Sequence, residues 1–467
     1  MKLRIPICCA AIVALAFLAG CSQTQPASDI PRLQKQGTAT QLIVDGKPFL
    51  MLAGELHNSS SSNLAYMQPI WPRLAAMHIN TVLPAVSWEL IEPQEGKFDF
   101  ALVDGLIRDA RTNNMRLVLL WFGSWKNGMS SYTPAWVKAN QDRFPRVQDS
   151  TGKGIEILST FGEQNRDADA RAFAALMRHI REVDGRQRTV VMMQVENEVG
   201  VLGDSRDRSE AANKAFAEPV PKELMDHLQK HRNALAPEFG KVWEAAGSQT
   251  SGTWEQVFGK GPATDEVFMA WYYARYIDHV TAAGKKEYPL PMYVNAWLSG
   301  PDGKPGDWPS GGPLPQVMPV WQAGAPQIDF LAPDIYATNF TDWCTWFHQS
   351  GNPLFIPETS GATGAFNAFY AFGQHDAMGF APFAIDSLGI SPLAAARAEP
   401  ADLPLTKSYE TLSQLAPLIK ESQGKGVMAG VVVSAGEPPQ KVTLGGYTLE
   451  VSYPRGRAPA PPAPAKP

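Results

Sequence analysis

A chain of 467 residues exceeds one ordinary domain, but a (β/α)8 barrel uses about 250 residues or more and grows by loop insertion, so one large domain with a small appendage fits. Hydrophobic residues make up 44% of the chain and aromatic residues 10%, which is ample for a large core. The formal net charge is −5 with acids and bases interspersed, and this balance gives no support for a nucleic-acid-binding protein.

The N-terminus has the pattern of a targeting segment. Lys2 and Arg4 precede an apolar stretch, 5–19, that is too short for a comfortable membrane span. This stretch leads into Leu-Ala-Gly-Cys21, which resembles the lipobox of bacterial lipoproteins, where the cysteine carries the lipid. We therefore expect a signal peptide over 1–20, lipidation at Cys21 and a location in the bacterial cell envelope, in the outer membrane. The alternative is a plain signal peptide and a periplasmic protein.

Two segments near the chain ends have low complexity. The polar residues 21–40 are predicted to be a tether, and the Pro/Ala-rich residues 454–467 a disordered tail. Once the signal peptide is removed, Cys21 and Cys344 remain, so a lipidated Cys21 leaves no partner for an intramolecular disulfide. Cys344 is then expected to be a small buried apolar residue.

Eight short apolar or β-branched runs follow, separated by segments long enough to hold helices. The runs are 49–56, 81–86, 116–122, 189–195, 291–296, 328–335, 354–357 and 380–385. Helical periodicity lies between several of them, at 102–113, 167–183, 222–236 and 264–283. A strand and a helix repeated eight times predict an α/β fold, a (β/α)8 TIM barrel over residues 41–395. The alternative, a doubly wound open sheet, lacks the glycine-rich phosphate turn after its first strand.

Two regions do not belong to the repeat. Residues 200–289 are too many for a plain crossover, so they predict an inserted subdomain beside the site, and the Gly- and Pro-rich loop 299–316 is expected to overhang the pocket. Residues 396–453 predict a small β-rich C-terminal region, with a helix at 409–421 and strands at 430–433 and 447–453.

Two glutamates lie at the ends of predicted strands. Glu198 follows the fourth run and Glu358 the seventh, and TIM-barrel active sites lie at the C-terminal strand ends. Two carboxyl groups across a sugar are the minimum for cleaving a glycosidic bond, one protonating the leaving oxygen and one attacking the anomeric carbon. Glu196 has the same strand parity as Glu198 and is the rival proton donor; we assign it to holding a neighbouring group.

The segment 194–200, Gln-Val-Glu-Asn-Glu-Val-Gly, resembles the acid/base motif of family 35 glycoside hydrolases, which are mostly β-galactosidases of the clan of retaining barrel enzymes. In that clan the acid/base follows an asparagine at the end of strand four, and the nucleophile ends strand seven. The resemblance implies that Glu198 is the acid/base and Glu358 the nucleophile. The chain is similar to a divergent bacterial branch near family 42, some of whose members act on galactosylated plant polysaccharides.

The resemblance extends to Gly54-Glu-Leu-His57 and to the loop 88–99, where the sequence also departs from the family. Glu89 stands where the family has an asparagine and Ile91 where it has a histidine, and a Trp-Phe-Gly-Ser-Trp-Lys-Asn-Gly segment, 121–128, replaces the usual sugar-binding segment. These changes leave both glutamates intact and alter the expected contacts with galactose.

The environment must give the two glutamates different roles. Burial and the charge of Glu358 should raise the pKa of Glu198, while a hydrogen bond from Tyr336 should keep Glu358 ionised. A retaining mechanism requires the carboxyl groups to be about 5 to 5.5 Å apart.

Other polar and aromatic side chains near strand ends are candidate sugar ligands. For the acids and the histidine a salt bridge at the rim is the alternative, and for the tryptophans a place in the core. The candidates are Asn197, Asn295, Tyr336, Glu55, His57, Glu89, Trp125 and Trp297.

The sequence therefore predicts a retaining exo-acting hydrolase that removes terminal β-galactose from an oligosaccharide or polysaccharide. No metal site is expected, because the histidines show no ligand spacing, and no cofactor or nucleic-acid partner is implied. The alternatives are a retaining glycosidase of the same clan with another specificity, a β-glucosidase or arabinosidase, and a lipoprotein that binds glycans without cleaving them. The sequence leaves the oligomeric state open.

Overall fold

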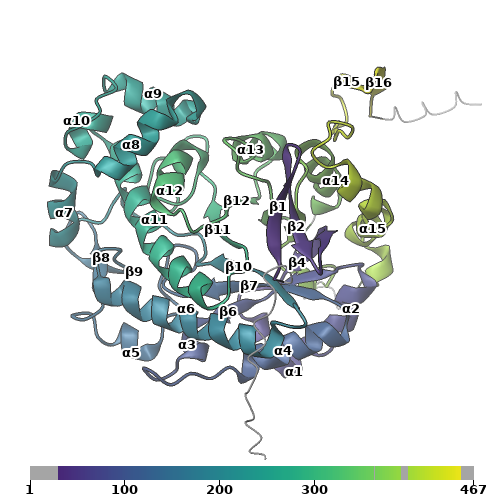
Figure 1. The fold of residues 1–467 in the computed structure, drawn as a ribbon, viewed down its shortest axis with the longest axis horizontal. Helices are drawn as coiled ribbons and strands as arrows, with labels where there is room; N and C mark the ends of the chain where they lie inside the picture. Colours follow the sequence, from purple (N-terminus) through teal and green to yellow (C-terminus); the bar gives the residue numbers. More distant parts are fainter. Residues whose placement is uncertain (1–29, 362, 391–397, 454–467) are drawn as a thin grey trace, which may run out of the picture.

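The computed structural model describes residues 30–361, 363–390 and 398–453, which form a closed parallel barrel surrounded by helices (Figure 1). The second barrel strand is divided at Pro84 into β5 and β6, and β10 pairs with β7 to close the cylinder. In barrel order the strands are β4 (Met51–Glu55), β5 (Thr81–Leu83) with β6 (Ala85–Ser87), β7 (Arg116–Phe122), β10 (Val190–Val195), β11 (Met292–Trp297), β12 (Phe330–Ile335), β13 (Ile356–Thr359) and β14 (Gly379–Pro382). Each overlaps one predicted run, which confirms the predicted TIM barrel.

The apolar runs become strands because parallel barrel strands are covered on both faces. Their side chains alternate between the barrel interior and the layer under the helices. The helices of this layer are α2 (Ile70–Ala76), α4 (Ala101–Thr112), α6 (Glu163–Asp184), α11 (Pro262–Glu287), α12 (Met318–Gly324), α13 (Phe340–Phe347), α14 (Gly364–His375) and α15 (Pro404–Ser422).

The predicted tether over 21–40 is wrong for the part that the structure describes. Residues from Arg32 onward form an antiparallel sheet of β1 (Arg32–Gln36), β2 (Ala39–Val44) and β3 (Lys47–Phe49). Leu42 and Val44 are buried and belong to the same apolar cluster as the barrel interior. The sheet therefore covers the N-terminal mouth of the barrel, opposite the C-terminal strand ends. The rest of the predicted tether, Cys21, the signal peptide and the Pro/Ala tail lie outside the described residues.

The predicted barrel boundary at 395 is also wrong, because α15 is the eighth helix of the barrel. The hydroxyl of Tyr409 on α15 lies 2.8 Å from the carbonyl oxygens of both Ala53 in β4 and Phe380 in β14. The helix thus packs across the junction of the first and last strands.

The insertion predicted over 200–289 is shorter in the structure, because α11 returns to the barrel layer beside α6. The inserted helices are α7 (Glu210–Ala217), α8 (Lys222–Lys230), α9 (Pro237–Ala245) and α10 (Trp254–Phe258). Three of them, α8 to α10, lie together at the upper left of Figure 1, above α7.

The C-terminal strands form one hairpin, β15 (Gln440–Leu444) and β16 (Tyr447–Val451), which projects from the body at the upper right of Figure 1. The strand expected at 430–433 is absent, since these residues have no regular structure.

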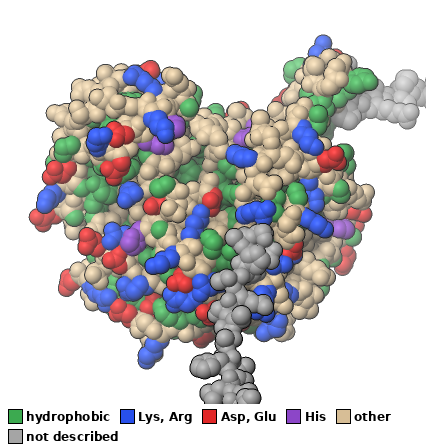
Figure 2. All heavy atoms as spheres, viewed as in Figure 1, with side chains coloured by type: hydrophobic (Ala, Val, Ile, Leu, Met, Phe, Trp, Pro, Cys, Tyr) green, Lys and Arg blue, Asp and Glu red, His purple; other side chains and the backbone are tan. Residues whose placement is uncertain are grey.

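The space-filling view shows charges of both signs scattered over the visible face (Figure 2). None of the described helices combines the length and apolar composition needed to cross a membrane.

Candidate active site

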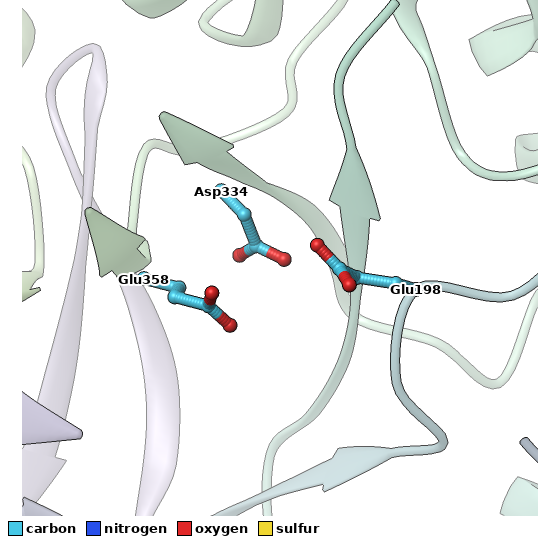
Figure 3. A group of neighbouring side chains, drawn as sticks. All are labelled: Glu198, Asp334 and Glu358. Atoms are coloured by element: carbon cyan, nitrogen blue, oxygen red, sulfur yellow. The ribbon is translucent and has the colours of Figure 1, made fainter. Parts of the chain in front are cut away.

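The structure brings Glu198 and Glu358 together at the C-terminal mouth of the barrel (Figure 3). Glu198 follows β10, Glu358 lies in β13, and Asp334 of β12 lies between them. One carboxylate oxygen from each of the three side chains lies within 4.8 Å of the other two. All three residues are buried: Glu198 is 5% exposed, Glu358 6% and Asp334 3%. A single anomeric carbon can therefore contact both glutamates.

The backbone after β10 turns sharply to direct Glu198 into the mouth. Glu196 and Glu198 both adopt positive φ angles, 63° and 47°, a conformation that costs free energy in residues with a Cβ and is common at active sites. The backbone amide of Glu198 donates a 3.0 Å hydrogen bond to the Asn295 side chain, and the Asn127 amide donates to the Glu198 carboxylate. The first contact holds the backbone of Glu198 in place and the second its side chain.

Burial, followed by the neighbouring charge of Glu358, raises the pKa of Glu198 to about 7, against the opposing effects of Lys126, Asp334 and Asn127. A shift from the ordinary glutamate pKa of 4.5 corresponds to roughly 3 kcal/mol of disfavoured ionisation. Glu198 can thus hold a proton near neutral pH and exchange it during a reaction, as a general acid requires.

Glu358 accepts a 2.6 Å hydrogen bond from the hydroxyl of Tyr336, while its other oxygen, Oε2, has no partner within the protein. The phenol is held in its protonated state, because burial and the Glu358 charge raise the pKa of Tyr336. Tyr336 thus donates to one oxygen of Glu358 and leaves the other available to a ligand.

Two further carboxyl groups, Glu55 and Asp334, complete the floor of the site. Burial, followed by the charge of Glu358, raises the pKa of both groups well above their ordinary values. The one cation that opposes the shift at Glu55 is Lys126, which is itself 5% exposed. Four carboxyl groups around one ammonium cannot all be ionised at low cost, so the raised pKa values of Glu55 and Asp334 favour their protonated forms.

Asp334 also connects the two halves of the site. Its Oδ2 accepts a 2.6 Å hydrogen bond from the side-chain amide of Asn295. The Asn295 oxygen in turn accepts a hydrogen bond from the backbone amide of Glu198. Asp334 lies opposite Glu358 in the register of β12 and β13. Asp334 is therefore linked to Glu198 through Asn295 and lies beside Glu358 on the neighbouring strand.

Among the described residues, Glu198, Asp334 and Glu358 form the one group that could offer three ligand atoms to a metal ion. Carboxylate oxygens at this spacing suit a hard divalent cation. Such an ion would occupy the position that a sugar must take between the two glutamates.

Glu196, the rival proton donor, points away from the mouth. Its Oε2 accepts a 2.7 Å hydrogen bond from the backbone amide of Trp125, and its other oxygen faces Asp169. Glu196 is 0% exposed, and burial together with Asp169 raises its pKa well above the ordinary value. A Cβ on Gly123 would lie 2.5 Å from Glu196 Oε1, so only glycine leaves room for this carboxyl pair.

The two asparagines predicted to bind sugar differ in their free groups. Asn295 has both ends of its amide occupied, by Glu198 and Asp334, so it positions those residues. The Asn197 oxygen accepts a hydrogen bond of 3.3 Å from the backbone of Asn127, but its Nδ2 is buried without a partner. Asn197 thus retains a donor for a ligand.

The polar rim candidates also differ. Glu89 forms an ion pair with Lys138 at 3.1 Å and is 38% exposed at its side chain, as in the alternative of a rim salt bridge. His57 Nδ1 lies 3.1 Å from both carboxylate oxygens of Asp386. The His57 side chain is 45% exposed, so the opposite edge of the ring is open to solvent.

The prediction for Trp125 is wrong. Its ring is 0% exposed, packs edge-on against Tyr273 and Tyr276, and donates from Nε1 to the carbonyl of Leu158. The indole is therefore part of the core, because the loop after β7 folds inward. Trp297, in contrast, is 41% exposed at the end of β11.

Sequence reasoning missed Lys126, Asn127 and Asp334. The first two lie in the segment 121–128, where the pattern shows only a departure from the expected family motif. Asp334 gives a clearer signal, since an acid at the end of the apolar run 328–335 is costly unless it has a role.

Comparison with known proteins supports a β-galactosidase-like glycoside hydrolase. The family 42 glycoside hydrolase model, described as β-galactosidase, matches residues 65–274, which contain Glu198, and a domain of unknown function matches residues 405–467. A β-galactosidase of Xanthomonas manihotis is 28% identical over 205 residues, covering 41% of this chain and 30% of that relative. The matching model is that of family 42, and a match to family 35 is not among these findings.

Solved structures share the fold at low identity. The β-galactosidase of Bacillus circulans sp. alkalophilus has a TM-score of 0.51 at 14% identity, covering 79% of this chain and 57% of the relative. The β-galactosidase of Rahnella sp. R3 gives 0.53 at 14%, covering 82% and 58%. The catalytic domain of a β-amylase from Paenibacillus polymyxa gives 0.53 at 12%, covering 78% and 98%. This chain thus spans less than two thirds of the β-galactosidases it resembles, and its barrel is similar to those of glycoside hydrolases.

Proposed function

We propose that the protein is a retaining glycoside hydrolase that releases terminal β-linked galactose from oligosaccharides or polysaccharides by double displacement. The observation that carries this proposal is the placement of Glu198 and Glu358 oxygens within 4.8 Å of each other at one barrel mouth. This closeness favours the retaining arrangement over the inverting one, where about 6.5 to 9.5 Å leaves room for a water.

The first step forms a covalent intermediate. Glu358 attacks the anomeric carbon through its unpaired Oε2, and Glu198 donates its proton to the glycosidic oxygen, so that the C–O bond breaks and the leaving group departs neutral. Protonated Glu55 and Asp334 add no charge that would compete with Glu358 as nucleophile.

The second step returns the enzyme to its starting state. Glu198, now ionised, removes a proton from a water molecule, whose oxygen attacks the anomeric carbon and displaces Glu358. Galactose is released with the configuration it had in the substrate. A pKa of about 7 suits Glu198 for both roles near neutral pH.

The experiment that tests this proposal compares aryl β-galactoside, β-glucoside and α-arabinoside as substrates. We expect the galactoside to have the highest kcat/KM, and proton NMR to show the β-anomer of galactose as the first product. Turnover of the glucoside or arabinoside alone would overturn the sugar assignment, and an α-anomer would overturn double displacement. Absence of any turnover would favour a glycan-binding protein.

We propose that the natural substrate is a plant cell-wall polysaccharide with galactose-bearing side chains. We also propose that the chain belongs near the boundary between glycoside hydrolase families 35 and 42. The Glu198-Glu358 pair supports an enzyme of their clan, and the family 42 match supports this neighbourhood.

For the location, we propose a lipid anchor at Cys21 in the bacterial cell envelope. The Leu-Ala-Gly-Cys21 motif supports this assignment. Metabolic labelling with palmitate should mark the wild type but not Cys21→Ala, and an unlabelled wild type would overturn the anchor.

A further inference from the structure

A large cleft continues from the catalytic mouth along one side of the barrel. Its volume is about 970 Å³, at the upper end of the range of about 300 to 1,000 Å³ that ligand pockets occupy. It begins at Asp334 and Tyr336 and runs between the loop 298–316 and the start of α13. One galactose bound between Glu198 and Glu358 leaves most of this volume to be filled.

The cleft presents aromatic rings that the protein core does not use. Trp297 is 41% exposed and Trp346 is 38% exposed, although large rings are normally well covered. Trp346 packs edge-on against Trp343, which also lines the cleft and is 6% exposed, with the ring centroids 4.8 Å apart. A flat, rigidly held indole at the edge of a catalytic cleft is suited to stack on the apolar face of a pyranose.

The facing loop is fixed rather than loosely attached. Trp308, which also lines the cleft, donates a 2.8 Å hydrogen bond to the buried Glu266 on α11. Gln316 approaches the other oxygen of Glu266 at 3.4 Å. The wall opposite Trp346 is therefore formed before any ligand binds, which lowers the entropic cost of binding.

The chemistry of the lining indicates the class of ligand. Of the described residues that line the cleft, the acidic ones are Asp307 and Asp334, and none is Lys or Arg. Short polar groups, such as those of Thr338 and Asn339, lie beside the tryptophans. This combination suits an uncharged chain of sugar rings and disfavours an anionic chain of uronic acids.

The position of the polar residues around the mouth indicates which part of the substrate lies in the cleft. The groups suited to bind the hydroxyls of one recognised sugar, Glu55, Lys126 and Asn127, come from β4 and the loop after β7, on the other side of the mouth. The cleft lies over β11 and β12, between the strands that carry Glu198 and Glu358. The galactose therefore occupies the polar side, and the leaving group extends into the aromatic cleft.

From these observations, and resting on the proposed galactosidase activity, we propose that the cleft binds the leaving-group side of the substrate, an uncharged chain of at least two pyranose rings. The enzyme is then built for galactose on the branches of a neutral polysaccharide rather than for disaccharides.

The test compares kcat/KM for three substrates: 4-nitrophenyl β-galactoside, lactose, and a xyloglucan oligosaccharide bearing terminal β-galactose. We expect the wild type to prefer the oligosaccharide to lactose by about tenfold or more, and Trp346→Ala to reduce the ratio of oligosaccharide to aryl substrate by about tenfold. Trp346→Phe, which keeps a ring, should restore most of the ratio. Phe366→Ala, at a ring 68% exposed on α14 outside the cleft, is the matched control and should keep the wild-type ratio.

Three outcomes would overturn the proposal: no preference of the wild type for the oligosaccharide, an equal loss on all substrates in Trp346→Ala, or equal turnover of a pectic oligosaccharide with a uronic acid backbone.

A second experiment tests the cleft without hydrolysis, by using tryptophan fluorescence to measure binding of the galactose-free xyloglucan oligosaccharide. A binding signal that Trp346→Ala removes supports the cleft even if the wild type cleaves no galactoside, which would reject the activity alone. Absence of binding, with normal cleavage of the aryl galactoside, rejects the cleft alone.

Discussion

The turn after β10 places two glutamates in different groups of buried carboxyls: Glu198 in the Glu198-Asp334-Glu358 cluster at the mouth, and Glu196 in the Glu196-Asp169 pair. Burial raises the pKa of Glu196 and of Glu198 alike. Glu196, however, accepts a hydrogen bond from the backbone of Trp125, faces Asp169 and is 0% exposed, whereas an oxygen of Glu198 lies within 4.8 Å of Glu358 at the barrel mouth. A raised pKa therefore does not by itself identify a reactive group. A raised pKa at the mouth, beside a second carboxyl group close enough to contact the same anomeric carbon, does.

The strongest test of this contrast is Glu358→Gln. An amide cannot attack the anomeric carbon, so we expect kcat for aryl β-galactoside to fall by about 10⁴-fold or more. Glu196→Gln is the matched control, since its amide oxygen can still accept from Trp125, and it should keep activity within about tenfold. A Glu196→Gln variant as inactive as Glu358→Gln would remove the distinction between the two groups.

Glu198→Gln should have the next largest effect, about 10² to 10⁴-fold on kcat/KM for lactose, because the leaving oxygen loses its proton donor. An aryl galactoside with an acidic leaving group should lose less in the first step. The wild-type rate should decline above a pH of about 7 as Glu198 loses its proton, and this alkaline limb should vanish in the variant. An alkaline limb that persists unchanged would assign the titration to another residue.

Stability should also depend on pH through Glu198. Its pKa is raised from 4.5 to about 7 in the folded protein, so the stabilisation by its bound proton is fully present below pH 4.5 and is lost as pH rises toward 7. Chemical denaturation at several pH values should show that the wild type loses roughly 3 kcal/mol across this window that Glu198→Gln does not lose. Glu421→Gln, at an exposed glutamate, should follow the wild type. Parallel curves for wild type and Glu198→Gln would contradict the shifted pKa.

Asp334 provides the smallest and most specific test. If it acts as a neutral group, Asp334→Asn should keep kcat/KM within about tenfold, because the amide can accept from Asn295 and donate to Glu198. Asp334→Ala should fall at least about tenfold below Asp334→Asn, because it leaves the Asn295 amide without a partner. Equal losses in both variants would indicate that Asp334 must be ionised.

The barrel strands were predictable because each consists of locally apolar residues bounded by polar ones, a pattern visible without knowledge of the neighbours. The N-terminal sheet was missed because the polar segment 21–40 shows no comparable pattern, and Leu42 and Val44 are buried only by the finished barrel. Likewise, α15 is a helix by its own periodicity, but its place as the eighth barrel helix depends on Tyr409 reaching β4 and β14, far away in the sequence.

Local periodicity and strand parity were enough to predict the repeated strand and helix pattern and the positions of Glu198 and Glu358 at strand ends. Only the tertiary structure decided that Asp334, Lys126 and Asn127 join these glutamates, that Trp125 belongs to the core, and that Trp297 and Trp346 border one cleft. The physical reason is that closing the barrel brings together side chains from distant strands and loops. Their burial, charges and hydrogen bonds are properties of that arrangement.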